Sequence, residues 1–373
     1  MNERSRPSFV SIDLARLRGN TTLLAQRAVP AELCAVVKAD AYGHGVLACA
    51  RAALAGGATS LAVALVEEAA ELRADRIGAP ILLLSEPPPG NEQRVVELDI
   101  EPTVYTRETI AALDDAAEAA SRVLRVHLKI DTGMRRVGAE VNDALDLAKQ
   151  IDTSANLDLH ATWTHFAVAD EPDDPFTLEQ AERFDATLAD FAAAGIDPGI
   201  RHVANSAALI VDPGRYAYDM VRVGIAIYGI APSRVLEGRV GIEPVLSLRS
   251  ELSYVRRVPA RVGVSYGLTH TTPSATTLGT VPLGYADGVR RNLSNRFDVL
   301  VHGERRPAVG TVTMDQFMVD LGDLPAVRGD DVVLIGSQAT GEITALDWAD
   351  TLGTIGYEVT CGIGARVPRE YVE

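Results

Sequence analysis

The chain has 373 residues, and its 51 acidic and 35 basic side chains give a formal net charge of −16. This acidity argues against a nucleic-acid or anionic-membrane partner, because both attract basic surfaces. Hydrophobic residues make up 47% of the chain and occur along its whole length, which argues against disorder. The length is typical of a folded protein with about two domains.

The cysteines and the N-terminal segment restrict the class of protein further. Cys34, Cys49 and Cys361 form neither a disulfide framework nor a spacing suited to structural zinc. The N-terminal segment MNERSRPSFV lacks the apolar core of a secretory signal. No run approaches the ~18 apolar residues that a membrane helix requires. We therefore expect a soluble, cytoplasmic protein that binds no metal.

In the first two-thirds of the chain, short β-rich apolar segments alternate with segments of helix length. Helical periodicity is clearest in residues 66–76, 107–120 and 177–195. The alternation predicts an α/β fold, a (β/α)8 barrel of the TIM type, over residues 1–240. An open doubly wound sheet is the alternative, but the G-x-G-x-x-G loop that it predicts is missing. The eight strand-like segments begin at Leu33, Ser60, Pro80, Pro102, Arg125, His160, Ile200 and Val221.

Residues 241–373 no longer alternate between strand-like and helix-like segments and are predicted to form a second, mostly β domain. Strand-like segments follow one another there with turn residues between them and no helices. Only residues 345–353, with Thr344 as a cap, look helical. The segment SFVSIDL, which begins at Ser8, leaves one alternative open. Residues 1–12 either belong to the barrel or pair with this second domain.

Polar side chains gather at the predicted carboxyl ends of the barrel strands, where the active site of such a barrel lies. Several of them are cations, in a protein whose net charge is strongly negative. This local excess of positive charge indicates an anionic ligand. The residues are Lys38, Tyr42, Arg136, His165, His202, Asn205, Ser206 and Arg222.

Two features of this set suggest pyridoxal 5'-phosphate as the ligand. Lys38 ends an apolar strand, and desolvation there lowers the pKa of an amine towards the range of a Schiff-base nucleophile. An isolated lysine is more often a surface residue, so this interpretation depends on its position. Asn205-Ser206 and Val223–Ile225 lie where barrels commonly bind phosphate, although Ser206 is equally suited to cap a helix. A lysine beside a phosphate site favours this cofactor.

The sequence also resembles a known family. AVVKADAYGHG, DTGMRRVG, HVANS, RVGIAIYG, VSYGLTH, PLGYADG and TMDQ stand in the order found in alanine racemases. GTIGYE and RVPREY complete the set, and the likeness runs from about Phe9 to Tyr371. The resemblance implies interconversion of L-alanine and D-alanine by two bases on a pyridoxal phosphate aldimine. It also implies a supply of D-alanine for peptidoglycan and a homodimer with composite active sites.

The resemblance assigns roles residue by residue. Lys38 would form the internal aldimine and act as one base, and Tyr266 of the partner subunit would act as the other. Arg222 would contact the pyridine nitrogen, with His165 linking it to Tyr266. Arg136 and the Met314 backbone would meet the substrate carboxylate, and Tyr285 and Asp315 would shape the entrance. Lys129 would either be carbamylated and orient Arg136, as in many members of the family, or be a salt-bridged lysine. The remaining cofactor-binding residues would be Tyr42, His202, Asn205, Ser206, Gly224, Ile225 and Tyr357.

Arg222 separates the possible chemistries. With a pKa above ~12 an arginine keeps its proton, so the ring nitrogen stays neutral and the electron sink is weakened. Decarboxylases on a similar barrel are expected to place a carboxylate there, so Arg222 favours a racemase. Three alternatives stay open: a racemase for serine or a broader range of amino acids, a non-catalytic cofactor carrier, and a cofactor-free Schiff-base aldolase. The sequence departs from the family pattern at Asp40, Thr313 and Gly356.

Overall fold

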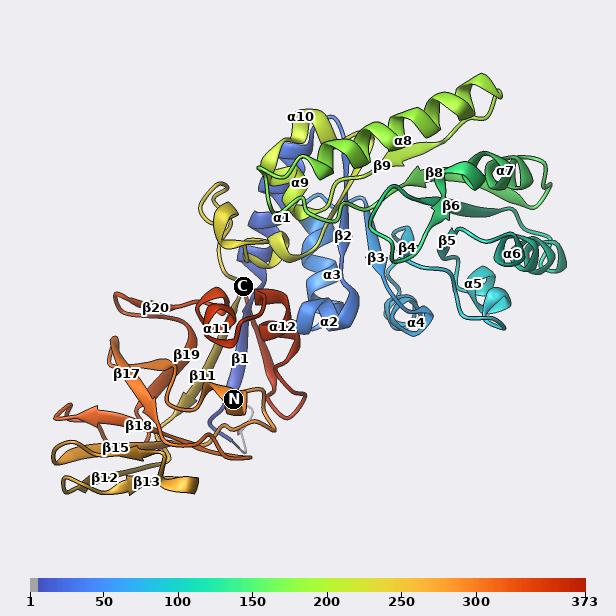
Figure 1. The fold of residues 1–373 in the computed structure, drawn as a ribbon. Coiled ribbons are helices and arrows are strands. Elements are labelled where there is room, and N and C mark those ends of the chain that lie inside the picture. The colour runs from blue at the N-terminus through green and yellow to red at the C-terminus, as the bar shows by residue number, and fades with distance from the viewer. Residues whose placement is uncertain (1–5) are drawn as a thin grey trace. The chain divides into compact units, whose positions relative to one another are not determined.

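The computed structural model describes residues 6–373, which form two compact units (Figure 1). The barrel unit comprises Leu17–Ala41 and Gly45–Ile242. The β unit comprises residues 6–16, Tyr42–His44 and Glu243–Glu373. Residues 1–5, for which the sequence left the barrel and the second domain open, lie outside the described residues. Among the residues described, no helix combines the length and the apolar character needed to cross a membrane.

The barrel unit confirms the predicted fold. Its main strands are all parallel and follow the order β10-β2-β3-β4-β5-β6-β8-β9, and the short β7 (Ala139–Glu140) pairs with β6. The two end strands are also linked, because Asp219 N–H donates to Arg201 O and Arg222 N–H donates to Ala204 O, each at 3.0 Å. The strands are β2 (Glu32–Val36), β3 (Ser60–Val63), β4 (Ile81–Leu83), β5 (Glu101–Val104), β6 (Leu124–Asp131), β8 (Leu157–Trp163), β9 (Ile200–His202) and β10 (Met220–Val223).

Helices follow the strands, and Figure 1 shows α4 to α8 along the outer side of the sheet. Each buries one apolar stripe, as α6 does with Ile110, Leu113 and Ala117 at three-to-four spacing. The helices are α1 (Leu14–Ala28), α2 (Lys38–Gly43), α3 (Val46–Ala55), α4 (Val66–Ala74), α5 (Glu92–Glu97), α6 (Arg107–Ala119), α7 (Val141–Asp152), α8 (Phe176–Ala193), α9 (Ser206–Val211) and α10 (Pro213–Tyr216). Two 3-10 turns, η1 (Ile225–Tyr228) and η2 (Arg234–Leu236), come after β10.

The β unit is built on a ten-stranded sheet. In it β1 (Phe9–Asp13) pairs antiparallel with β11 and parallel with β21. The other strands are β11 (Leu246–Glu251), β12 (Tyr254–Val258), β15 (Thr276–Val281), β16 (Asp298–Val301), β17 (Glu304–Val309), β18 (Phe317–Gly322), β19 (Asp331–Gln338), β20 (Gly341–Ile343) and β21 (Arg369–Val372). A separate hairpin joins β13 (Gly263–Val264) to β14 (His270–Thr271), and η3 (Tyr266–Leu268) lies between them. A further 3-10 turn is η4 (Arg291–Leu293).

The helices of the β unit differ from the prediction. The predicted helix is present as α11 (Ala345–Leu352), and Thr344 caps it through a reciprocal pair of hydrogen bonds with Asp347. A second helix, α12 (Gly356–Cys361), was not predicted. It has only six residues, among them glycine and two β-branched residues, so its intrinsic helix propensity is low.

Candidate functional site

The barrel unit places its predicted site residues at one end of the strands. Lys38 follows β2 by two residues and is half-buried, and His165 follows β8 by two residues. His202 is the last residue of β9, and Arg222 lies within β10. Arg136 lies in the segment after β6, where it is exposed. The carboxyl ends of the barrel strands therefore present a lysine, two arginines and two imidazoles.

The backbone directly after Lys38 winds in the left-handed sense. Residues 39–42 have φ angles of 52° to 55°, and Ala41 N–H closes the turn on Val37 O at 2.9 Å. A left-handed turn costs about 1–2 kcal/mol for each non-glycine residue, so the surrounding contacts must hold it in place. Asp40 contributes one of them, because its carboxylate accepts from the N–H of Val46 at 2.7 Å, at the start of α3. Strained backbone held in this way is typical of functional sites.

Arg222 is buried and fully engaged at its two terminal nitrogens. It is 3% exposed, and Nη1 donates to Nδ1 of His202 at 2.7 Å and to His202 O at 2.9 Å. Nη2 donates to the carbonyl oxygens of residues 164 and 203 and to Nδ1 of His165, at 2.9 to 3.2 Å. These bonds use only Nη1 and Nη2, so Nε–H is the donor left for a ligand.

The charge states around Arg222 follow from burial. Burial lowers the pKa of Arg222 to about 9, below the value assumed from the sequence, yet the guanidinium stays protonated at neutral pH. Burial, and then the positive charge of Arg222, hold the pKa of His202 and of His165 well below the ordinary histidine value. Both imidazoles are therefore neutral, and both accept a hydrogen bond from Arg222.

Lys129 lies in the same interior, in β6. Its side chain is buried, and Nζ lies 4.4 Å from the ring centroid of Trp163. The Arg222 guanidinium lies at the same distance from this ring, which stacks on His202 with an interplanar angle of 14°. Burial, followed by the charges of Arg136 and Arg222, lowers the pKa of Lys129 to about 7. The amine is therefore largely unprotonated at slightly alkaline pH.

The segments around Ser206 test the capping role that the sequence allowed for it. Asn205 caps α9, because its side chain accepts from the N–H of Ala208 at 3.0 Å. Ser206 Oγ instead accepts from the N–H of Gly224 at 3.0 Å, so the capping role that the sequence allowed for Ser206 was wrong. Its hydroxyl hydrogen is the donor that remains, and Ile225, next to Gly224, begins η1. The loops after β9 and β10 are thus joined by a buried hydroxyl.

The β unit contains the other predicted residues. Tyr42 and Tyr357 are in ring contact at 5.9 Å between centroids. Burial raises the pKa of Tyr42, so its hydroxyl keeps its proton. Tyr285 and Met314 stand on adjoining loops, because Ala286 N–H donates to Met314 O at 3.1 Å. Asp315 is exposed and pairs with Arg366 at 2.9 Å.

Tyr266 lies in η3 of the same unit and is 74% exposed. It is one of several large apolar side chains that the loops of the β unit expose, together with Leu268, Tyr285, Met314 and Ile355. The structure therefore gathers the predicted residues into two sets, one in each unit. Lys38, the predicted Schiff-base lysine, belongs to one set, and Tyr266, the predicted second base, belongs to the other.

Three polar or aromatic residues of the barrel interior were missed by the sequence reasoning: Glu101, His127 and Trp163. His127 and Lys129 stand two residues apart in one strand, so they share a face. Polar residues at this spacing within the apolar segment RVHLKID were the signal that could have identified His127. Glu101 and Trp163 carried no comparable signal, because their partners come from other strands.

Comparisons with known proteins match both parts of the chain. Family models described as the N-terminal and C-terminal domains of alanine racemase match residues 12–232 and 245–371. The alanine racemase of Halothermothrix orenii is 42% identical over 374 residues, covering 100% of this chain and 98% of the relative.

Solved structures also match over the whole chain. An alanine racemase from a D-cycloserine-producing Streptomyces lavendulae matches with a TM-score of 0.95 at 42% identity, over 100% of this chain and 98% of that one. A histidine racemase from Leuconostoc mesenteroides matches with a TM-score of 0.91 at 27% identity, over 100% of both chains. The fold is thus shared by racemases with different named substrates. With both family models matched along nearly its whole length, the chain belongs to the alanine racemase family.

Proposed function

We propose that this protein is a pyridoxal-phosphate-dependent racemase that interconverts L-alanine and D-alanine and supplies D-alanine for peptidoglycan. Its membership of the alanine racemase family supports the reaction. The observation that carries the proposal is Arg222, a buried, protonated guanidinium with both terminal nitrogens bound to the barrel. A donor that keeps its proton at this position suits a racemase better than a decarboxylase.

The chemistry of the donors fits pyridoxal phosphate. Arg222 offers Nε–H to an acceptor such as a ring nitrogen, and Ser206 offers its hydroxyl hydrogen to an anion. Ser206 joins the loops after β9 and β10, where barrels commonly bind phosphate. We assign phosphate contacts to Ser206 and to the backbone of Gly224 and Ile225. Tyr42, Tyr357, His202 and Asn205 complete the surroundings of the cofactor.

The bound cofactor supplies an electron sink that makes the proton on the substrate Cα acidic. Lys38 holds the cofactor and removes or returns the Cα proton on one face. Tyr266 does the same on the opposite face, since racemisation needs a base on each side. His165 accepts a hydrogen bond from Arg222 at Nδ1, so its Nε2–H is available to the Tyr266 hydroxyl. Arg136 and the Met314 backbone bind the substrate carboxylate, and Tyr285 and Asp315 shape the entrance.

We further propose that Tyr266 acts in the active site of a partner subunit. Tyr266 is 74% and Met314 52% exposed in the single chain, and exposed apolar groups of this kind mark interaction surfaces. A homodimer would cover them and complete two composite sites. The same interface would bring Tyr285 and Asp315 to the mouth of the neighbouring barrel.

Subunit complementation tests this arrangement. Lys38→Ala and Tyr266→Phe are each expected to abolish most racemisation as homodimers. Random mixing of the two after mild denaturation should recover about a quarter of wild-type activity, because half of the dimers are mixed and one of their two sites is intact. Recovery at the level of the unmixed variants would place both bases in one chain and contradict the composite site.

The function itself is tested by measuring conversion of L-alanine to D-alanine by the purified protein with pyridoxal phosphate. Serine, histidine and basic amino acids form the comparison, since a fold shared with a histidine racemase leaves substrate preference to the pocket. The visible absorbance of the bound cofactor should change in Lys38→Ala. No turnover of alanine alongside turnover of another amino acid would refute the proposed substrate.

A further inference from the structure

A continuous hydrogen-bonded chain of side chains crosses the barrel interior, from Arg222 in β10 to Glu101 at the start of β5. Arg222 Nη1 lies 2.7 Å from His202 Nδ1, and His202 Nε2 lies 3.1 Å from His127 Nδ1. His127 Nε2 lies 3.2 Å from Glu101 Oε2. The four residues are at most 9% exposed, so the hydrogen bonds that join them are shielded from water.

The direction of every bond in this chain is fixed by Arg222. A guanidinium can only donate, so Nδ1 of His202 accepts and the single ring proton of His202 lies on Nε2. That proton is donated to Nδ1 of His127, which places the proton of His127 on Nε2, where it is donated to Glu101. Burial lowers the pKa of both imidazoles, so each carries only one proton. The chain thus joins a cation to a carboxylate through two neutral rings.

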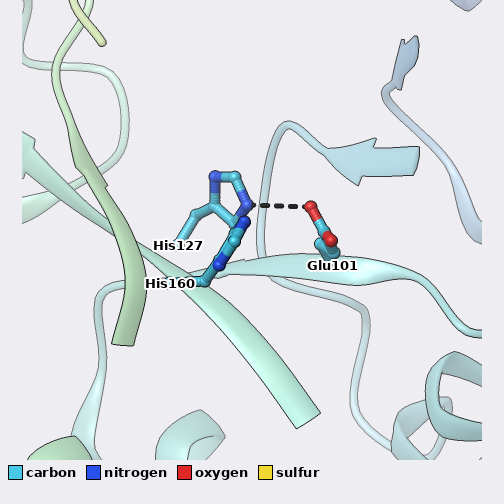
Figure 2. A group of neighbouring side chains, drawn as sticks. All are labelled: Glu101, His127 and His160. Atoms are coloured by element: carbon cyan, nitrogen blue, oxygen red, sulfur yellow. Dashed lines mark hydrogen bonds and ion pairs between the residues drawn. The ribbon is translucent and has the colours of Figure 1, made fainter. Parts of the chain in front are cut away.

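A metal ion is the alternative occupant of the same place. Glu101, His127 and His160 point their donor atoms toward one another, all within 4.8 Å (Figure 2), and these donor types are the ones that zinc prefers. A metal would need the lone pair of His127 Nε2, and the chain from Arg222 places a proton there. Arg125 also occupies the other oxygen of Glu101, at 3.0 Å. The hydrogen-bonded chain accounts for the contacts of His127 with His202 and Glu101, and a metal does not.

We propose that Glu101 and His127 are positioning residues that act on Arg222 from the opposite end of the barrel. His127, itself bonded to Glu101, accepts the Nε2–H of His202 and so stabilises the tautomer whose Nδ1 binds the guanidinium. Without an acceptor on the far side, the buried Nε2–H of His202 is left unbonded, and moving its proton to Nδ1 would set two donors against each other. This inference rests on the proposed function, in which Arg222 contacts the cofactor ring.

The tautomers can be measured directly in the protein with its bound cofactor. The chain has 7 histidines, so nitrogen-15 spectra of ring-labelled protein are simple enough to assign with single variants. We expect His127 and His202 to carry the proton on Nε2. His44 is an internal reference of the opposite tautomer, because its Nδ1 lies 3.0 Å from a carbonyl oxygen and must donate. A proton on Nδ1 of His127, or zinc retained at one ion per chain after dialysis and lost in His160→Ala, would overturn the proposal.

A matched pair of variants tests the effect on the reaction. In His127→Gln the amide oxygen can accept from His202 and the amide N–H can donate to Glu101, whereas His127→Leu, of similar size, can do neither. We expect kcat to fall about 10-fold or more in His127→Leu and about 3-fold or less in His127→Gln, with KM for alanine nearly unchanged in both. The acceptor signal of His202 Nδ1 should persist only in the glutamine variant.

A role limited to packing predicts the reverse order, because a buried leucine is better accommodated in an apolar core than a buried amide. A kcat in His127→Leu equal to or above that of His127→Gln, with the His202 signal unchanged, would therefore refute the proposal. The tautomer measurement on wild type is independent of whether either variant folds. It also separates the two proposals: absent alanine turnover refutes the proposed function, and reversed tautomers refute only the positioning role.

Discussion

Lys129 is expected to react with carbon dioxide and carry a carbamate. Only an unprotonated amine attacks carbon dioxide, and burial together with Arg136 and Arg222 lowers the pKa of Lys129 to about 7. At pH 8 such an amine is about 90% unprotonated, whereas a lysine with a pKa of about 10.4 is roughly 0.4% unprotonated. The reactive fraction is therefore raised about 200-fold. The product carries a negative charge among cations, which stabilises it.

The lysine content of the chain makes the assay selective. The sequence has three lysines, Lys38, Lys129 and Lys149, and Lys149 is exposed on α7. Protein equilibrated with carbon-13 bicarbonate at pH 8 should give one carbamate signal per chain by carbon-13 NMR. Lys129→Arg keeps a cation that does not form a carbamate and should lose the signal, and Lys149→Arg is the matched control that should retain it.

The pH dependence gives a second measure of the same reasoning. At pH 6 only about 10% of an amine with a pKa of about 7 is unprotonated, so carbamylation should become about 10-fold slower than at pH 8. If the carbamate orients Arg136, removal of carbon dioxide should raise KM for alanine in wild type and leave Lys129→Arg unaffected. A carbamate signal missing from wild type at pH 8, or persisting in Lys129→Arg, would refute the argument.

Two further substitutions test the packing of the β unit. Gly43 has φ +82°, and an added Cβ would lie 2.4 Å from the Thr360 carbonyl oxygen. Gly43→Ala should therefore lower the free energy of unfolding by more than about 2 kcal/mol, as measured by thermal melts. Gly90→Ala is the control, because Gly90 has a similar φ of +89° but lies in open space, and its effect should be smaller. Burial would raise the pKa of Asp287, but hydrogen bonds from Arg6 hold it below its ordinary value. Its stabilisation is therefore present above about pH 4 and lost as the pH falls further, and the melting temperature of Asp287→Asn should vary less than that of wild type between pH 5 and 3.

Local sequence was sufficient to predict the barrel strands. Buried parallel strands are nearly continuous apolar runs, and β2, β3 and β4 each begin within one residue of the start predicted for them. Lys38, His202 and Arg222 could be placed at the mouth because a strand end in a barrel is a defined location. Short elements such as α12 could not be predicted, since six residues of low helix propensity are ordered by tertiary packing.

The roles of individual side chains depended on partners distant in sequence. The sequence analysis offered Ser206 as the cap of α9, but Asn205 caps the helix, whereas Ser206 Oγ accepts from the N–H of Gly224. The left-handed turn after Lys38 has no signature in its residues, ADAY, none of which is glycine.

By itself the sequence determined the (β/α)8 barrel, the mostly β second domain and the membership of the alanine racemase family, because periodicity and ordered motifs are local properties. The tertiary structure decided the proton positions on His127 and His202, the lowered pKa of Lys129 and the engagement of Arg222. These properties depend on burial and on charges brought together from β5, β6, β8, β9 and β10. These side chains lose their water, and their hydrogen bonds take a fixed direction, only once the barrel strands have closed around them.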